Sequence, residues 1–184
     1  PNPLASDGRH HREPWFGCAC CPSNICRFIP SVPGYVYAAE GKDLYVNLYM
    51  ANTMTHKLQG REVTLSQATS YPWIGDVCIT VDANKAGTFT LKLRIPGWVR
   101  GEVVPSDLYS YADGLQTGYS VRVNGEEQTA ELDHGYFCIT RDWKAGDEVE
   151  LHFDMEPRLV RAHEAVEADR GRLAVERGPL VYCA

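Results

Sequence analysis

The fold of this chain is decided by the stretch Phe89-Thr90-Leu91-Lys92-Leu93-Arg94-Ile95, in which apolar and polar residues alternate at every position. A period of two places every apolar side chain on one face of an extended segment, which predicts a β-strand with one buried face. Similar patterns occur in further short segments, which are Asp43–Met50, Arg61–Leu65, Val77–Val81, Tyr119–Val123, Glu126–Ala130, Tyr136–Thr140, Glu148–Phe153, Arg158–Val160 and Leu173–Glu176. Many short strands predict a mainly β protein, built as an antiparallel β-sandwich.

Turn residues separate these segments. Gly41-Lys42, Gly60 and Ala86-Gly87 each lie between two expected strands, because glycine adopts the backbone angles of tight turns. Asn124-Gly125 is the strongest hairpin signal, since this pair favours a two-residue turn between antiparallel strands. The polar segment between Gly97 and Gly118 is expected to be a surface insertion in the sandwich.

The composition is typical of a globular protein, with 184 residues, 44% hydrophobic and 23% charged. The formal net charge is −6, and Lys and Arg are scattered, which argues against a nucleic-acid-binding face. No stretch approaches the roughly 20 consecutive apolar residues of a membrane span. We therefore expect neither a nucleic acid nor a membrane as partner. For a bacterial protein, periplasm and cytoplasm both remain open.

A helical pattern occurs near the amino end, where apolar residues recur every three or four positions. This spacing predicts a short helix with one buried stripe, which Pro30 and Pro33 end or kink early. The stripe is formed by Ile25, Phe28, Ile29 and Val32.

The run Cys18-Ala19-Cys20-Cys21-Pro22-Ser23-Asn24 precedes this helix and holds three of the seven cysteines. A helix that begins near Ser23 or Asn24 directs unpaired N–H groups and the positive end of its dipole at Cys20 and Cys21, which favours the thiolate. Thiolates bind soft metals and attack carbon, so this run is the candidate chemical site.

Three interpretations of Cys20 and Cys21 are open. They could form a vicinal disulfide, lie buried as small apolar residues, or bind a metal, and we favour the metal. A closed zinc site needs four ligands, and no second Cys-x-x-Cys or His pair follows in the sequence. The nearest residues that could complete the site are His10, His11 and Glu13, although loop residues of these types are more often solvated.

The motif Trp15-Phe16-Gly17-Cys18-Ala19-Cys20-Cys21-Pro22-Ser23-Asn24, followed by an apolar helix, resembles the thiol motif of glycoside hydrolase family 127, which contains β-L-arabinofuranosidases. Further stretches are similar to the β-sandwich that follows the catalytic barrel of that family; they are Tyr71-Pro72-Trp73, Leu93–Trp98, Val123-Asn124-Gly125 and Glu176–Tyr182. The resemblance covers nearly the whole chain.

This resemblance implies a retaining glycosidase whose catalytic domain is an (α/α)6 barrel. In the family, zinc is held by a Glu, an upstream Cys and two adjacent Cys, one of which is the nucleophile. By position, Cys20 resembles the nucleophile and zinc ligand, and Cys21 resembles the neighbouring zinc ligand. The upstream Glu and Cys ligands and the acid/base Glu have no counterpart here, so we expect the remaining zinc ligands outside this chain. No role transfers to Cys18.

The same resemblance implies a domain organisation. Residues 1–38 are expected to be the remnant of the barrel, 39–156 the β-sandwich, and 157–184 further strands that are incomplete at the carboxyl end. The expected partners are an arabinose-containing oligosaccharide and the missing amino-terminal barrel segment. We expect the isolated chain to be inactive.

A non-catalytic β-sandwich module that binds carbohydrate or serves a structural role is the alternative, with Trp73, Trp98 and Trp143 as sugar platforms. Aromatic residues in a sandwich more often belong to the core. A zinc-stabilised interaction module is a third possibility. The acid pairs are expected to be solvated; they are Glu126 with Glu127, Glu148 with Glu150, and Glu164 with Glu167. Asp107, Asp113 and Asp133 are expected to be turn residues.

Overall fold

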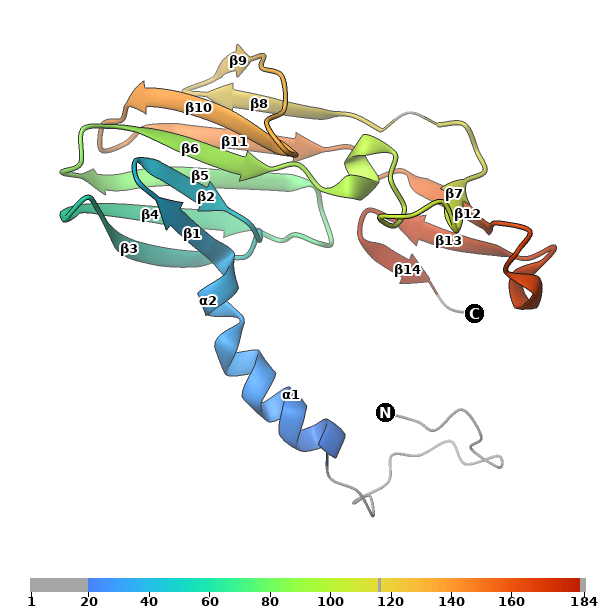
Figure 1. Cartoon of the computed structure of the whole chain (residues 1–184). Coiled ribbons are helices and arrows are strands. Elements are labelled where there is room, and N and C mark those ends of the chain that lie inside the picture. The colour runs from blue at the N-terminus through green and yellow to red at the C-terminus, as the bar shows by residue number, and fades with distance from the viewer. Residues whose placement is uncertain (1–19, 116, 183–184) are drawn as a thin grey trace. The chain divides into compact units, whose positions relative to one another are not determined.

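The computed structural model describes residues 20–115 and 117–182. The chain divides into two compact units, residues 1–35 and 36–184, and each is described by itself. The predicted mainly β fold with a short amino-terminal helix is confirmed (Figure 1). None of the helices in the described ranges has the length and apolarity that crossing a membrane requires.

The first unit contains helix α1, Cys20–Ser31, and most of the short helix α2, Pro33–Val36. The expected helix start at Ser23 or Asn24 is wrong, because α1 already includes both cysteines. Pro22 is compatible with this earlier start, since a helix needs no N–H donor in its first turn. The expected end is confirmed, because α1 ends one residue after Pro30.

The apolar stripe of α1 is not buried. Ile25, Phe28 and Ile29 are 51%, 60% and 62% exposed. The prediction of a buried stripe therefore fails in the described part of the first unit. The reason is that this part consists of α1 and the turn that follows it, so it offers no second element for the stripe to pack against.

The first sheet of the second unit has four strands in the order β1-β2-β6-β10. Their bounds are Tyr37–Glu40 for β1, Asp43–Val46 for β2, Thr88–Arg94 for β6 and Tyr136–Asp142 for β10. The decisive stretch forms β6, and its Phe89, Leu91 and Leu93 are buried as the alternation predicts. Strand β2 pairs with β6 in parallel, whereas the other pairs are antiparallel.

The second sheet has six antiparallel strands in the order β3-β4-β5-β11-β8-β9. Their bounds are Asn52–Leu58 for β3, Arg61–Thr69 for β4, Asp76–Asn84 for β5, Glu148–Phe153 for β11, Tyr119–Val123 for β8 and Glu126–Gln128 for β9. The predicted hairpin joins β8 to β9, with positive φ values of 53° at Asn124 and 81° at Gly125. Both angles suit a type I′ turn.

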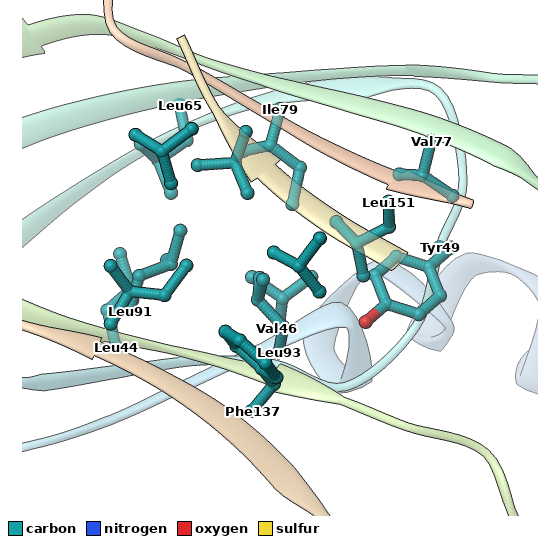
Figure 2. Packing of buried hydrophobic residues seen from close by; sticks show 14 of the residues in the cluster. Leu44, Val46, Tyr49, Leu65, Val77, Ile79, Leu91, Leu93, Phe137 and Leu151 are labelled. Atoms are coloured by element: carbon teal, nitrogen blue, oxygen red, sulfur yellow. The ribbon is translucent and has the colours of Figure 1, made fainter. Parts of the chain in front are cut away.

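The core lies between these two sheets, which confirms the predicted sandwich. Leu44, Leu91 and Phe137 of the first sheet face Leu65 and Ile79 of the second (Figure 2). Alternating side chains of both inner faces interdigitate in this layer, which removes their apolar area from water. The loop residue Trp143 closes the core at 1% exposure and donates its indole N–H to the carbonyl of Phe89 at 3.1 Å.

A third sheet has the order β14-β13-β12-β7. Its strands are Leu180–Tyr182 for β14, Leu173–Arg177 for β13, Pro157–Ala162 for β12 and Tyr109–Tyr111 for β7. Strand β7 and the 3₁₀ helix Gly97–Arg100 lie in the segment expected to be a surface insertion. That expectation is therefore wrong, because Trp98 and Val99 are buried and β7 pairs with β12.

Asp147 fixes the loop that carries Trp143. Its carboxylate is 7% exposed and accepts hydrogen bonds from the Lys144 backbone N–H at 2.8 Å and the Asn124 amide at 2.9 Å. The hydrogen bond from Lys144 has the largest effect and the one from Asn124 the next, and both lower the pKa of Asp147 below its ordinary value. Burial acts in the opposite direction and is smaller. The carboxylate thus ties the loop to the β8–β9 hairpin.

Replacing Asp147 with Ala is expected to lower the free energy of unfolding by about 1–3 kcal/mol at neutral pH, because buried donors lose their acceptor. The stabilisation is present above the unfolded pKa of about 3.9 and is lost as the pH falls below it through the lower folded pKa. Urea unfolding of both proteins from neutral pH to below this unfolded pKa measures the effect. The control is Asp107→Ala, since Asp107 is exposed and without an ion pair among the described residues. An equal loss in both variants would contradict the role of Asp147.

Candidate active site

The two adjacent thiols are the first residues of α1. Their sulfur atoms lie 3.8 Å apart, both cysteines are free, and both side chains are exposed. This separation is far longer than the roughly 2.05 Å of a disulfide bond. The structure therefore supports neither a vicinal disulfide nor burial for Cys20 and Cys21.

The first turn of α1 surrounds this pair with polar groups. Its leading N–H groups have no partner within the helix, as at every helix amino end. The Ser23 hydroxyl donates to the Cys20 carbonyl at 3.1 Å. The Arg27 guanidinium donates to the Ser23 hydroxyl at 3.4 Å and to the Asn24 side-chain oxygen at 3.2 Å. A cation is thus held on the first turns of the helix.

Sequence reasoning did not single out Arg27. The signal was present in the spacing, because Arg27 follows Ser23 by four residues and Asn24 by three. Side chains at these spacings are neighbours on a helix surface. The prediction of a later helix start obscured this relation.

The pair also fits two of the four positions of a zinc site. Two thiolates that bind zinc tetrahedrally at about 2.3 Å lie about 3.8 Å apart, which matches the distance between Cys20 and Cys21. Among residues 20–115 and 117–182, no group of three or more His, Cys, Asp or Glu could hold a metal. Cys18, His10, His11 and Glu13 lie outside the described residues.

The tryptophans of the alternative interpretation differ in exposure. Trp98 and Trp143 are buried in the core, whereas Trp73 is 67% exposed. The acid pairs expected to be solvated are all exposed, which confirms that expectation. Asp113 has a further role, because it pairs with the buried Arg158 at 3.2 Å.

Sequence reasoning also missed Glu176. This carboxyl lies on β13, is 7% exposed, and accepts a hydrogen bond from the Tyr111 hydroxyl at 2.8 Å. Burial raises the pKa of Glu176, and the Tyr111 hydrogen bond and the Arg158 charge offset part of this shift. No local sequence pattern predicts the burial of Glu176, because this burial depends on strands that pair over long sequence distances.

Residues 43–155 match the profile described as the β-L-arabinofuranosidase GH127 middle domain, and residues 157–184 match the glycoside hydrolase family 127 C-terminal domain. The chain belongs to glycoside hydrolase family 127. The resemblance seen in the sequence is thereby confirmed. These matches cover the sandwich and the third sheet, whereas the thiol pair precedes them.

Individual members of family 127 are similar over almost the entire chain. A non-reducing end β-L-arabinofuranosidase of Bifidobacterium longum subsp. longum is 37% identical over an alignment 195 positions long, which covers 100% of this chain and 26% of that protein. The solved GH127 β-arabinofuranosidase BT3674 is 56% identical with a TM-score of 0.94, over 100% of this chain and 29% of that one. A GH127 β-L-arabinofuranosidase from Geobacillus stearothermophilus T6 is 40% identical with a TM-score of 0.78, over 96% of this chain and 26% of that one.

This chain therefore spans between a quarter and a third of the length of these family 127 relatives. The shared part includes the helix with the two adjacent cysteines, because the alignments cover all or almost all of the chain. Family membership is thus established for the chain, and the chemistry of its thiol pair follows as a proposal.

Proposed function

We propose that this chain is part of a retaining glycoside hydrolase that acts on β-L-arabinofuranosides, with Cys20 as the nucleophile. The observation that carries the proposal is the exposed pair of free thiols, 3.8 Å apart on the first turn of α1. Support for the substrate class comes from the relatives, which are named as β-L-arabinofuranosidases.

In the proposed reaction, the Cys20 thiolate attacks the anomeric carbon of the sugar. A carbon–sulfur bond forms while the bond to the leaving oxygen breaks, and an acid protonates that oxygen. Water then displaces the sulfur, with the same group accepting the water's proton. The result is a free sugar with retained configuration and a regenerated thiolate. We place the acid/base group outside this chain.

Cys20 and Cys21 would supply two ligands of a zinc ion. When bound, zinc keeps a coordinating thiol deprotonated at neutral pH. Cys20 would then serve as the attacking group, and Cys21 would position Cys20 by binding the same zinc ion. The amino end of α1 carries unpaired N–H groups at the same place.

Replacing Cys21 with Ala in the full-length protein is expected to lower its zinc content by at least about 10-fold at limiting free zinc, because a ligand is removed. Elemental analysis after dialysis measures the zinc-to-protein ratio. The matched control is Cys26→Ala, since Cys26 is also exposed on α1. A Cys21→Ala protein that retains one zinc per chain would contradict ligation by Cys21.

The proposed function is tested by comparing the full-length protein with the isolated chain. The full-length protein is expected to release arabinose from an aryl β-L-arabinofuranoside with retained configuration, which NMR of the first-formed product detects. We expect the isolated chain to be inactive, because we place the acid/base group outside it. Inversion at the anomeric carbon, or no turnover of any arabinofuranoside by the full-length protein, would refute the proposal.

The alternative of a non-catalytic carbohydrate-binding module based on the three tryptophans receives little support. Trp98 and Trp143 are buried, and their indole N–H groups donate within the core to Tyr71 and Phe89. Only Trp73 of the three is exposed.

A further inference from the structure

A cavity of about 660 Å³ lies on the outer face of the six-stranded sheet, formed entirely by the second unit. Strands β4, β5, β11 and β8 contribute its floor, and they are consecutive neighbours in the sheet (Figure 1). Residues Ser70 and Ile74, from the connection between β4 and β5, form part of its wall. The cavity is therefore built on paired strands, which hold its side chains in fixed positions.

The strand register arranges the floor as a grid. Outward-facing residues of β5, β11 and β8 stand directly opposite one another, so their side chains are neighbours. The first row consists of Cys78, Glu150 and Arg122, and the second row consists of Asp76, His152 and Ser120, each given in the order β5, β11, β8.

The first row contains a hydrogen-bond donor, Arg122, and an acceptor, Glu150, that have no partner among the described residues. Glu150 and Arg122 are opposite partners in register. Opposite charges at this position commonly pair, yet neither side chain takes part in an ion pair or hydrogen bond within the described ranges. A guanidinium and a carboxylate therefore both remain available to a ligand, and each can bind two adjacent hydroxyl groups.

The second row is held in place. His152 Nδ1 lies 2.6 Å from Asp76 Oδ1, and His152 Nε2 lies 3.5 Å from Asp154 Oδ1. The imidazole is thus fixed between two carboxylates. Among the residues that line the cavity, Asp76 and Glu150 outnumber the one arginine, Arg122, which disfavours phosphates and other anions.

The first row ends in an apolar strip, which consists of Cys78, Ala68 and Ile74. Ala68 stands opposite Cys78 in register, and Ile74 lies on the wall. Burial, followed by the charge of Glu148, raises the pKa of Cys78, so this thiol is neutral at pH 7. The cavity thus combines an apolar strip with a row of hydrogen-bonding groups.

We propose that this cavity, which is lined by residues of the second unit, binds a neutral sugar unit. Sugar hydroxyls donate to Glu150 and accept from Arg122, while the C–H face of the ring lies on the apolar strip. The volume accommodates one or two sugar rings. Among the described residues no metal-binding cluster competes for this role. The proposal goes beyond the proposed function, because it requires neither zinc nor turnover.

Alkylation of Cys78 tests the proposal directly, because this thiol lies in the floor of the cavity. The full-length protein is treated with iodoacetamide in the presence of methyl β-L-arabinofuranoside or methyl β-D-xyloside, and each cysteine is quantified by peptide mass spectrometry. At a sugar concentration of four times Kd, the rate at Cys78 is expected to fall about fivefold. Protection by either sugar supports the site.

Cys138 is the internal reference, because it is also half-buried, on β10, and burial likewise raises its pKa. Its rate is expected to stay unchanged. Arg122→Gln is expected to abolish the protection of Cys78, whereas Arg172→Gln, at an exposed arginine outside the cavity, retains it.

Rates are compared with and without sugar in the same variant, so a changed intrinsic reactivity of Cys78 cancels. Equal protection of Cys78 and Cys138, equal protection by glycerol, or unchanged protection in Arg122→Gln would overturn the proposal. If the proposed function alone is wrong, the full-length protein shows no turnover of an arabinofuranoside, while the sugar still protects Cys78.

Discussion

Replacing Cys20 with Ser in the full-length protein is expected to lower kcat by at least about 1,000-fold, since removing a nucleophile eliminates the covalent route. Serine retains the shape of the side chain, but its hydroxyl stays protonated at neutral pH. The side chain is exposed on the first turn of α1, so we expect the variant to fold normally. Circular dichroism and the unfolding midpoint check this point.

Two measurements separate the nucleophile from a merely structural cysteine. Peptide mass spectrometry with fragmentation of the wild-type protein, quenched during turnover of a slow substrate, is expected to show an arabinosyl adduct on Cys20. Cys26→Ser serves as the matched control, because Cys26 is exposed on the same helix, and it is expected to retain full activity. Undiminished turnover in Cys20→Ser would exclude the proposed role.

Replacing Gly75 with Ala is expected to destabilise the sandwich severely. A Cβ atom at this position would lie 2.0 Å from the carbonyl oxygen of Phe153 and 2.9 Å from its carbonyl carbon. Both are backbone atoms, so no change of rotamer relieves the overlap. The Phe153 N–H also donates to the Gly75 carbonyl at 3.1 Å, and this bond would be lost as the strands separate.

The expected loss exceeds about 4 kcal/mol in the free energy of unfolding, in the range reserved for severe steric damage. Phe153 is fully buried, and its ring lies 5.5 Å from that of Tyr49 and 5.9 Å from that of Trp98, so a backbone shift would disturb the core. Urea denaturation measures the loss. Gly34→Ala is the control, because nothing lies within 4 Å of its added Cβ. Similar stability of the two variants would show that β5 and β11 adjust freely.

Most of the strands that sequence analysis predicted alternate between buried and more exposed side chains, as β2, β6 and β11 do. It missed β3, Asn52–Leu58, because this edge strand leaves most of its residues exposed and carries little apolar alternation. It missed β7 for a related reason, since only three residues of a polar segment pair with β12. Local patterns report one buried face, and they are silent about strands stabilised mainly by backbone pairing.

The candidate site divides in the same way. Cys20 and Cys21 stood out because three cysteines are crowded into one short run. The cavity on the outer sheet face could not be foreseen, because Glu150 and Arg122 become neighbours only through the register of β8 and β11. Chemistry carried by adjacent residues is visible in a sequence, whereas chemistry assembled across strands requires the fold.

The parallel pairing of β2 with β6 has a consequence for synthesis on the ribosome. The β3–β4 and β4–β5 pairs join strands that follow one another, so they can form as soon as their residues emerge. Strand β2 must wait for β6, and β6 in turn waits for β10, which ends at Asp142. Until β6 and then β10 emerge, the nascent chain therefore carries an unpaired strand edge, and such edges favour aggregation.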